Sequence, residues 1–223
     1  MSLILSLETS GPHASVALHR SGNCLAEVHT EAPSQHASQL TLMAEACLKE
    51  AQCDWSHLEA LAVSIGPGSY TGLRIGLSTA KGFCFGLDLP LIALNTLQIM
   101  AAALPSQGAL RLPMLDARRM EVYAAIFDAD LKEVWPSQAL ILDAQAFGSF
   151  GSQKILAFGS GSSKWERLGL PPHVERLEQP LEPRAKHMGA LAHAAFLNKD
   201  WVSLVDIEPL YLKEFQGHGG NRQ

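Results

Sequence analysis

The chain has 223 residues, of which 47% are hydrophobic and 17% are charged. This length and composition exclude intrinsic disorder as the main state and predict one large or two small folded domains. Its 17 Lys and Arg residues against 22 Asp and Glu residues give a net charge of −5, the wrong sign for a protein whose main task is to hold a nucleic-acid backbone.

The first half of the chain alternates strand and helix patterns. Short apolar segments separated by turn residues predict three consecutive strands. Apolar residues spaced i, i+3, i+4 and i+7 then predict a helix over 36–51. The predicted strands of this half are 3–7, 14–18, 24–29, 58–65 and 90–94, and its remaining predicted helices are 72–87 and 95–104.

The second half repeats this scheme in a reduced form after a linker at 105–108. Its predicted strands are 110–115, 121–127, 134–142 and 154–158, with a helical turn at 143–147, a short helix after 159–162 and a last helix at 185–198. Two related α/β units follow from this repetition, the first over 1–105 and a smaller second one over 106–223.

A glycine-rich loop at 66–72 joins a predicted buried strand to a predicted helix. Such a junction can surround an anion with backbone N–H groups, although this loop matches neither of the common phosphate-binding motifs. The alternative is a tight turn that lets the helix lie close to the sheet.

The helix after this loop carries small residues at Gly72, Gly76 and Ala80, and a second pair at Gly82 and Gly86. Glycine destabilises a helix interior by about 1 kcal/mol, so this spacing predicts the close approach of another backbone. Its apolar residues cover nearly the whole circumference, which predicts burial on more than one side. The 36–51 helix, a partner chain or both are the candidates for the second side.

Targeting and metal signals are few. The N-terminus has no basic leader, no stretch approaches the roughly 20 apolar residues that span a bilayer, and the four cysteines form no CxxC pair. These features predict a cytoplasmic location with reduced thiols. No HxxxH pair or GxSxG motif is present. The charge cluster of Asp116, Arg118, Arg119 and Glu121 is typical of a solvated hairpin edge.

Four segments together resemble the TsaB (YeaZ) family. They are ILSLETS at 4–10, GPGSYTGLRIGLSTAKGF at 66–83, DARRMEVYAA at 116–125 and PLYLKE at 209–214. The resemblance implies the two-lobed actin-like ATPase fold (ASKHA, RNase H-like). It also implies a shortened, non-catalytic paralogue of TsaD, the catalytic subunit that makes threonylcarbamoyladenosine in tRNA.

The resemblance implies partners and cofactors as well. TsaD would form a heterodimer with this chain, TsaE would join the pair, and the chain alone would form a homodimer. Transfer RNA would be reached indirectly, through the complex. The resemblance implies no resident cofactor or metal. It implies at most weak nucleotide binding, at a vestigial site made by Glu8, Gly66, Gly68 and Ser69.

Two positions support the non-catalytic interpretation. The histidines of the metal motif in TsaD align with Thr96 and Met100, neither of which is a plausible metal ligand. Glu8 stands where the superfamily usually has aspartate, which would displace a metal-and-phosphate geometry. The alternatives are a small ATP-dependent phosphotransferase of the same superfamily and a glycoprotease-like metalloprotease.

The expected contact with TsaD is a four-helix interface. Its predicted residues are His36, Leu40, Met43 and Cys47 on the first helix and Gly72, Leu73, Gly76, Leu77 and Ala80 on the second. On this hypothesis, Leu40→Asp or Gly76→Leu abolishes the heterodimer and leaves the monomer folded.

Overall fold

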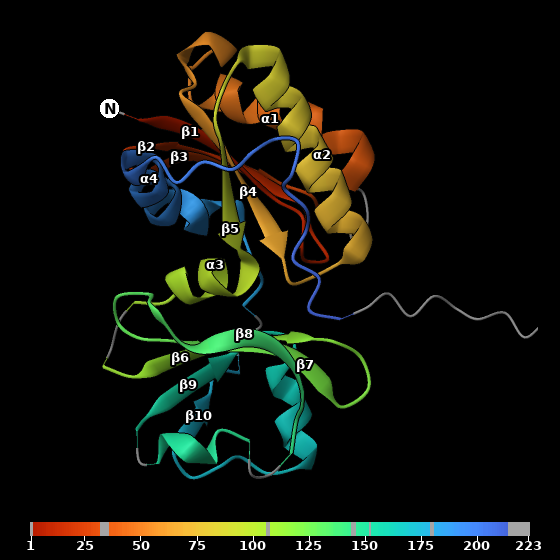
Figure 1. Cartoon of the computed structure of the whole chain (residues 1–223), viewed down its shortest axis with the longest axis vertical. Helices are drawn as coiled ribbons and strands as arrows, with labels where there is room; N and C mark the ends of the chain where they lie inside the picture. Colours follow the sequence, from red (N-terminus) through yellow and green to blue (C-terminus); the bar gives the residue numbers. More distant parts are fainter. Residues whose placement is uncertain are drawn as a thin grey trace, which may run out of the picture.

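The computed structural model describes residues 2–31, 36–105, 108–143, 146–151, 153–178 and 181–213. They form two stacked lobes, each built on a five-stranded mixed sheet (Figure 1). The predicted α/β class with a reduced second lobe is confirmed. No helix among these residues is long and apolar enough to cross a membrane.

The first lobe has the strand order β3-β2-β1-β4-β5. β1 pairs antiparallel with β2 and parallel with β4, so the sheet changes from a meander to crossover connections at its central strand. The strands are β1 (Leu3–Glu8), β2 (Ser15–Arg20), β3 (Asn23–His29), β4 (Ala60–Gly66) and β5 (Leu91–Asn95).

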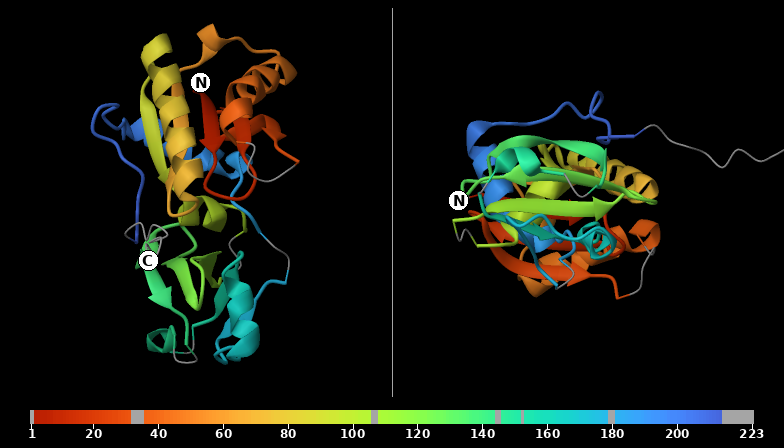
Figure 2. Two further views of the ribbon diagram at one scale, coloured as in Figure 1. Left: turned by 90° about the vertical axis from the view of Figure 1, so that its right-hand side faces the viewer. Right: turned by 90° about the horizontal axis from the view of Figure 1, so that it is seen from below.

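Helices cover both faces of this first sheet (Figures 1 and 2). α1 (His36–Glu50) and α2 (Tyr70–Leu87) pack on one face, around the alternate β1 residues Leu3, Leu5 and Leu7. α4 (Gly189–Asn198) covers the other face, around Ile4. This alternation along β1 explains why the strand is buried at every position.

The second lobe has the strand order β10-β9-β6-β7-β8. Its strands are β6 (Leu110–Asp116), β7 (Glu121–Phe127), β8 (Glu133–Ile141), β9 (Ile155–Phe158) and β10 (Val174–Arg176). One face packs on Trp165 of the short helix η3 (Ser162–Arg167), and the other faces α3 (Thr96–Ala102), which lies between the lobes. The three-residue β10 is too short for its pattern to have been predicted.

The predicted unit 106–223 needs a correction at its end. The last helix begins as a 3-10 turn, η4 (Ala185–Met188), and with α4 it packs on the first sheet rather than the second. Close contacts with the β2–β3 hairpin hold it there: a Cβ at Gly189 would lie 2.2 Å from the Gly22 carbonyl oxygen. Arg184 adds a bidentate contact to the Glu27 carboxylate, at 2.6 and 3.1 Å.

Residues 199–213, here called the C-terminal strap, then run back along the first lobe towards the second (Figure 1). The Val202 N–H donates to the Leu91 carbonyl at 3.0 Å, and the Leu210 N–H donates to the Ile65 carbonyl at 2.7 Å. Lys213 ends the strap in an ion pair with Glu121 of β7. The strap therefore connects the two lobes.

The junction of η4 with the first sheet predicts acid sensitivity. Burial, followed by the charge of Lys186, lowers the pKa of His187 to about 4. The folded-state pKa lies below the unfolded value of 6.5, so the stability is present above pH 6.5 and is lost as pH falls towards 4. Between pH 7 and pH 5 the free energy of unfolding is expected to fall by about 2 kcal/mol through this residue. Urea denaturation of the wild type and His187→Gln at both pH values checks this, and an equal loss in the variant would contradict it.

Candidate functional site

The glycine-rich loop leads from the end of β4 into α2 and is held by the loop that follows β1. The Ser69 N–H donates to the Ser10 carbonyl at 2.8 Å, and the Ser69 hydroxyl caps α2 by accepting from the Gly72 N–H at 3.2 Å. The Thr9 hydroxyl donates to the Gly72 carbonyl at 2.8 Å. These contacts fix the start of α2 against β1.

The small residues of α2 are explained by this contact within the chain. A Cβ at Gly72 would lie 2.0 Å from the Thr9 carbonyl oxygen, and one at Gly76 would lie 2.1 Å from Thr9 Oγ1. The predicted close approach of another backbone therefore exists at Gly72, where Thr9 of the same chain makes it, and at Gly76 the neighbour is the side chain of Thr9. Gly82 and Gly86 differ, because a Cβ at either position would meet nothing within 4 Å.

The residues predicted to form a partner interface are mostly buried in the chain itself, which corrects that prediction. On α1, Leu40, Met43 and Cys47 lie in the core of the first lobe. On α2 the buried residues are Gly72, Leu73, Gly76, Leu77 and Ala80. The apolar periodicity marked the face of each helix that packs on the sheet, and such a face is closed to a partner. The side chain of His36 lies outside the described residues.

The opposite sides of the two helices are open, and we call them the outer helix face. It includes Leu42 on α1, with 64% of its side chain exposed, and Phe85 on α2, with 86% exposed. Ser78, Gly82 and Gly86 are exposed on the same helix as Phe85. Figures 1 and 2 show α1 and α2 on one face of the first sheet, with no described helix or strand packed over their outer sides.

The C-terminal strap covers one flank of α2. The Arg74 guanidinium lies 4.1 Å from the ring centroid of Tyr70 and donates to the Tyr211 hydroxyl at 2.9 Å. Lys81 lies about two turns further along the same side of α2, and its ammonium group donates to the Ile207 carbonyl at 2.8 Å. The two charges of this helix therefore hold the strap, a role that sequence reasoning missed. Their spacing of seven residues on one stripe was the available signal.

The four residues predicted as a vestigial nucleotide site lie around the contact of strap, loop and β1. Glu8 is fully buried and its Oε1 accepts the Ser10 N–H at 2.6 Å, while Oε2 accepts no hydrogen bond from the described residues. A Cβ at Gly66 would lie 2.7 Å from the Leu210 carbonyl oxygen of the strap, and one at Gly68 would lie 2.6 Å from Ser10. The chain itself thus fills the space beside both glycines.

Glu8 provides a test of this burial. Loss of solvent raises its pKa above the ordinary value of 4.5, with contacts to Ser10 acting in the opposite direction. Because the folded pKa is the higher one, stability is present below pH 4.5 and is lost as pH rises through the folded value. The advantage of Glu8→Gln over the wild type in free energy of unfolding is therefore expected to grow from pH 5 to pH 8. Denaturant titration of both proteins measures it, and a constant difference would contradict it.

The positions aligned with the metal motif belong to α3. Thr96 and Met100 are both buried between the lobes, and the Gln98 amide donates to the Leu131 carbonyl at 3.2 Å. Over the described part of the chain, no group of three or more His, Cys, Asp or Glu side chains is arranged to hold a metal ion.

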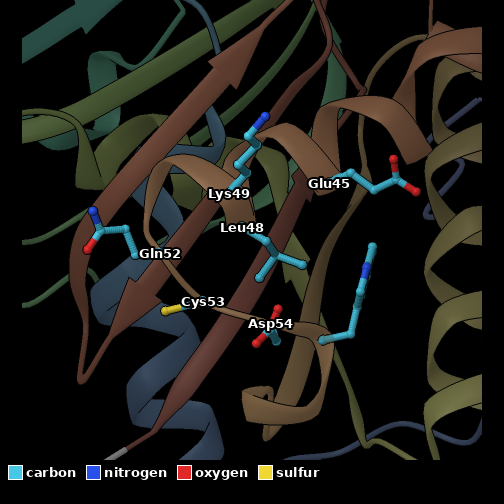
Figure 3. Close-up of a pocket in the computed structure, with 7 residues that line it drawn as sticks. Glu45, Leu48, Lys49, Gln52, Cys53 and Asp54 are labelled. Carbon is cyan, nitrogen blue, oxygen red and sulfur yellow. The ribbon is translucent and has the colours of Figure 1, made fainter.

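A cleft of about 320 Å³ lies elsewhere on the first lobe, between the end of α1 and the segment that leads to β4 (Figure 3). Trp55 on its wall packs against Phe83 of α2, with ring centroids 4.9 Å apart. Its lining combines Lys49 with carboxylates and the half-buried Cys53 thiol, and none of the predicted site residues takes part. The lining residues are Glu45, Leu48, Lys49, Gln52, Cys53, Asp54 and Trp55.

The sequence is similar to known proteins along almost its whole length. It is 32% identical to the tRNA threonylcarbamoyladenosine biosynthesis protein TsaB of Escherichia coli, over 94% of each chain. The chain belongs to the TsaB family. A family model described as TsaD, tRNA N6-adenosine threonylcarbamoyltransferase, matches residues 28–147, a segment that includes both α1 and α2.

Solved structures agree with this membership. The structure of YeaZ from Pseudomonas aeruginosa superposes with a TM-score of 0.85 at 30% identity, covering 95% of this chain and all of that one. The activator of 2-hydroxyisocaproyl-CoA dehydratase from Clostridium difficile has a TM-score of 0.52 at 5% identity, covering 94% and 99%. That second likeness concerns the fold alone.

Proposed function

We propose that the chain is a non-catalytic subunit in the synthesis of threonylcarbamoyladenosine in tRNA, and that it binds and organises a TsaD-type catalytic subunit. Membership of the TsaB family supports the pathway. The observation that carries the binding role is the outer helix face, where Leu42 and Phe85 are exposed and Gly82 and Gly86 leave open space.

The match to the TsaD model supports the identity of the partner. Because that match includes α1 and α2, a TsaD-type protein would present an equivalent helix pair. Two such pairs can pack as four helices, with exposed glycines admitting side chains from the partner. The same face is self-complementary in kind, so a homodimer is proposed for the chain alone. Partner binding would act by favouring the active conformation of the catalytic subunit.

The other components belong to the same proposal. TsaE would join the assembled pair, tRNA would be held mainly by other subunits, and the assembly would work in the cytoplasm. The burial of Glu8 and the filling of the space at Gly66 support a minor role for nucleotide at this loop. The phosphotransferase and metalloprotease alternatives are not favoured by the family relationship.

Size-exclusion chromatography with light scattering tests the proposal. The chain is measured alone and mixed with TsaD from the same organism. We expect a one-to-one complex that replaces the homodimer. A chain that elutes unchanged in the presence of TsaD would overturn the proposed function, and magnesium-dependent ATP turnover would then be measured.

A further inference from the structure

The turn between β6 and β7 holds two successive arginines in a backbone conformation that suits them poorly. Arg118 has φ of 69° and Arg119 has φ of 51°, in the left-handed region that favours glycine and asparagine. The β2–β3 turn also has two successive positive φ angles, but there the residues are Ser21 and Gly22. Residues better suited to positive φ therefore form a similar turn elsewhere in this chain. Turn formation alone does not explain the two arginines.

The carboxylates beside these arginines are already neutralised by other groups. Asp116 Oδ1 accepts from the Lys164 ammonium at 2.7 Å and from the Arg118 N–H at 2.6 Å. Glu121 forms an ion pair with Lys213 of the C-terminal strap. Lys164 also donates to the Glu121 carbonyl at 2.6 Å. The turn is thus braced from β7, η3 and the strap, and its acidic charges are used internally.

Both arginine side chains remain exposed, and neither guanidinium forms an ion pair with any residue that the structure describes. The charge of Arg118 acts on the phenol of Tyr123 in β7, lowering a pKa that burial raises. A guanidinium therefore lies near a half-buried aromatic ring at the side of the second lobe that faces α3. In Figure 1 the turn extends beyond β7 on the side of the molecule where α1 and α2 lie.

We infer that Arg118 and Arg119 bind phosphate oxygens of an RNA backbone. Two adjacent planar guanidinium groups offer paired N–H donors that match phosphate oxygens, and the braced turn holds them ready. Phosphate contacts position a nucleic acid without reading its sequence. The choice of tRNA as this RNA rests on the proposed function. With a net charge of −5 on the whole chain, the contact is local and complements basic surface on the partner.

The test measures tRNA binding by the complex of this chain with TsaD. A fluorescein-labelled tRNA transcript is titrated, and anisotropy is recorded at several salt concentrations. We expect R118A/R119A to bind about tenfold more weakly. The slope of log K against log salt should shrink by about 1.5 to 2, since two phosphate contacts are lost. The matched control is R167A/K132A, which removes two exposed cations of the same lobe and should change neither value appreciably.

A second variant separates binding from folding. R118N/R119G removes the same charges but places residues that accept positive φ in the turn. Its melting temperature is expected to rise above that of the wild type, while its tRNA affinity falls as in R118A/R119A. Loss of affinity in a more stable protein cannot come from unfolding.

Several results would overturn the inference. The first is an unchanged tRNA affinity and salt slope in both arginine variants. The second is an equal loss of tRNA affinity in the control variant. The third is a loss of ATP binding by the arginine variants with their tRNA affinity retained, which would assign the arginines to a nucleotide. Light scattering on the same samples reports assembly separately. Failure of the arginine variants to bind TsaD would assign the turn to the protein interface. Failure of the wild type to bind TsaD would contradict the proposed function instead. In that case tRNA would be titrated into the wild-type and variant chains alone, and equal affinities would overturn the role of the arginines.

Discussion

Replacing Gly72 by alanine is expected to lower the free energy of unfolding by about 3 kcal/mol or more. The added Cβ would lie 2.0 Å from the Thr9 carbonyl oxygen. This neighbour is backbone, so the clash can be relieved only by moving α2 away from the loop after β1. That movement would also break the Thr9 hydroxyl contact to the Gly72 carbonyl. Equilibrium urea denaturation, followed by circular dichroism, measures the loss.

The matched control for this substitution is Gly82→Ala, in the same helix. A Cβ there meets nothing within 4 Å, so the change should stabilise the protein by about 1 kcal/mol through helix propensity alone. The change in the free energy of unfolding is therefore expected to be negative for Gly72→Ala and positive for Gly82→Ala. A Gly72→Ala protein as stable as the wild type would contradict the packing of α2 described above. The same packing revises the expectation for Leu40→Asp and Gly76→Leu, which should destabilise the monomer itself.

Replacing Phe85 by aspartate is expected to weaken binding of TsaD at least about a hundredfold, with little effect on folding. An aromatic side chain central to an interface commonly contributes about 2 kcal/mol or more, and a carboxylate in its place must lose water against an apolar partner. Because 86% of Phe85 is exposed, the free energy of unfolding should change by no more than about 0.5 kcal/mol. Calorimetric titration with TsaD gives the affinity.

Ile141→Asp provides the comparison for Phe85→Asp. Ile141 is a large apolar residue with 67% exposure at the end of β8 in the second lobe, away from the outer helix face. The Ile141→Asp substitution should leave the affinity for TsaD unchanged. Equal affinities for wild type and Phe85→Asp would exclude the outer helix face as the partner surface, whatever the control shows.

The sequence predicted the elements well because their signals are local. The i, i+3, i+4 pattern from Leu40 and the glycine-rich entry into α2 each depend on a few neighbouring residues, and both helices exist close to the predicted bounds. What covers each helix depends on distant residues. The spacing of Gly72 and Gly76 correctly indicated a close contact, but a pattern along one helix cannot say whether the contacting backbone belongs to the same chain.

Contacts between remote segments explain what was missed at the candidate site. Arg74 meets Tyr211 across 137 positions, and Glu27 meets Arg184 across 157. Neither pair has a signature in the sequence, because its geometry arises only when η4 and the strap return to the first lobe. The positive φ at Arg118 likewise has no signature in the sequence, because residue types alone do not reveal backbone angles.

The return of η4, α4 and the strap to the first sheet has a consequence for biosynthesis. The second sheet, from Leu110 to Arg176, is an insertion within the first lobe. The final helix of the first lobe, and the segment that pairs with its edge strand β5 at Leu91, come from residues beyond 184. A ribosome therefore releases everything needed for the second sheet before it releases the last pieces of the first. The face of β1 around Ile4 must stay open until α4 has emerged, so the lobe translated first is the one completed last.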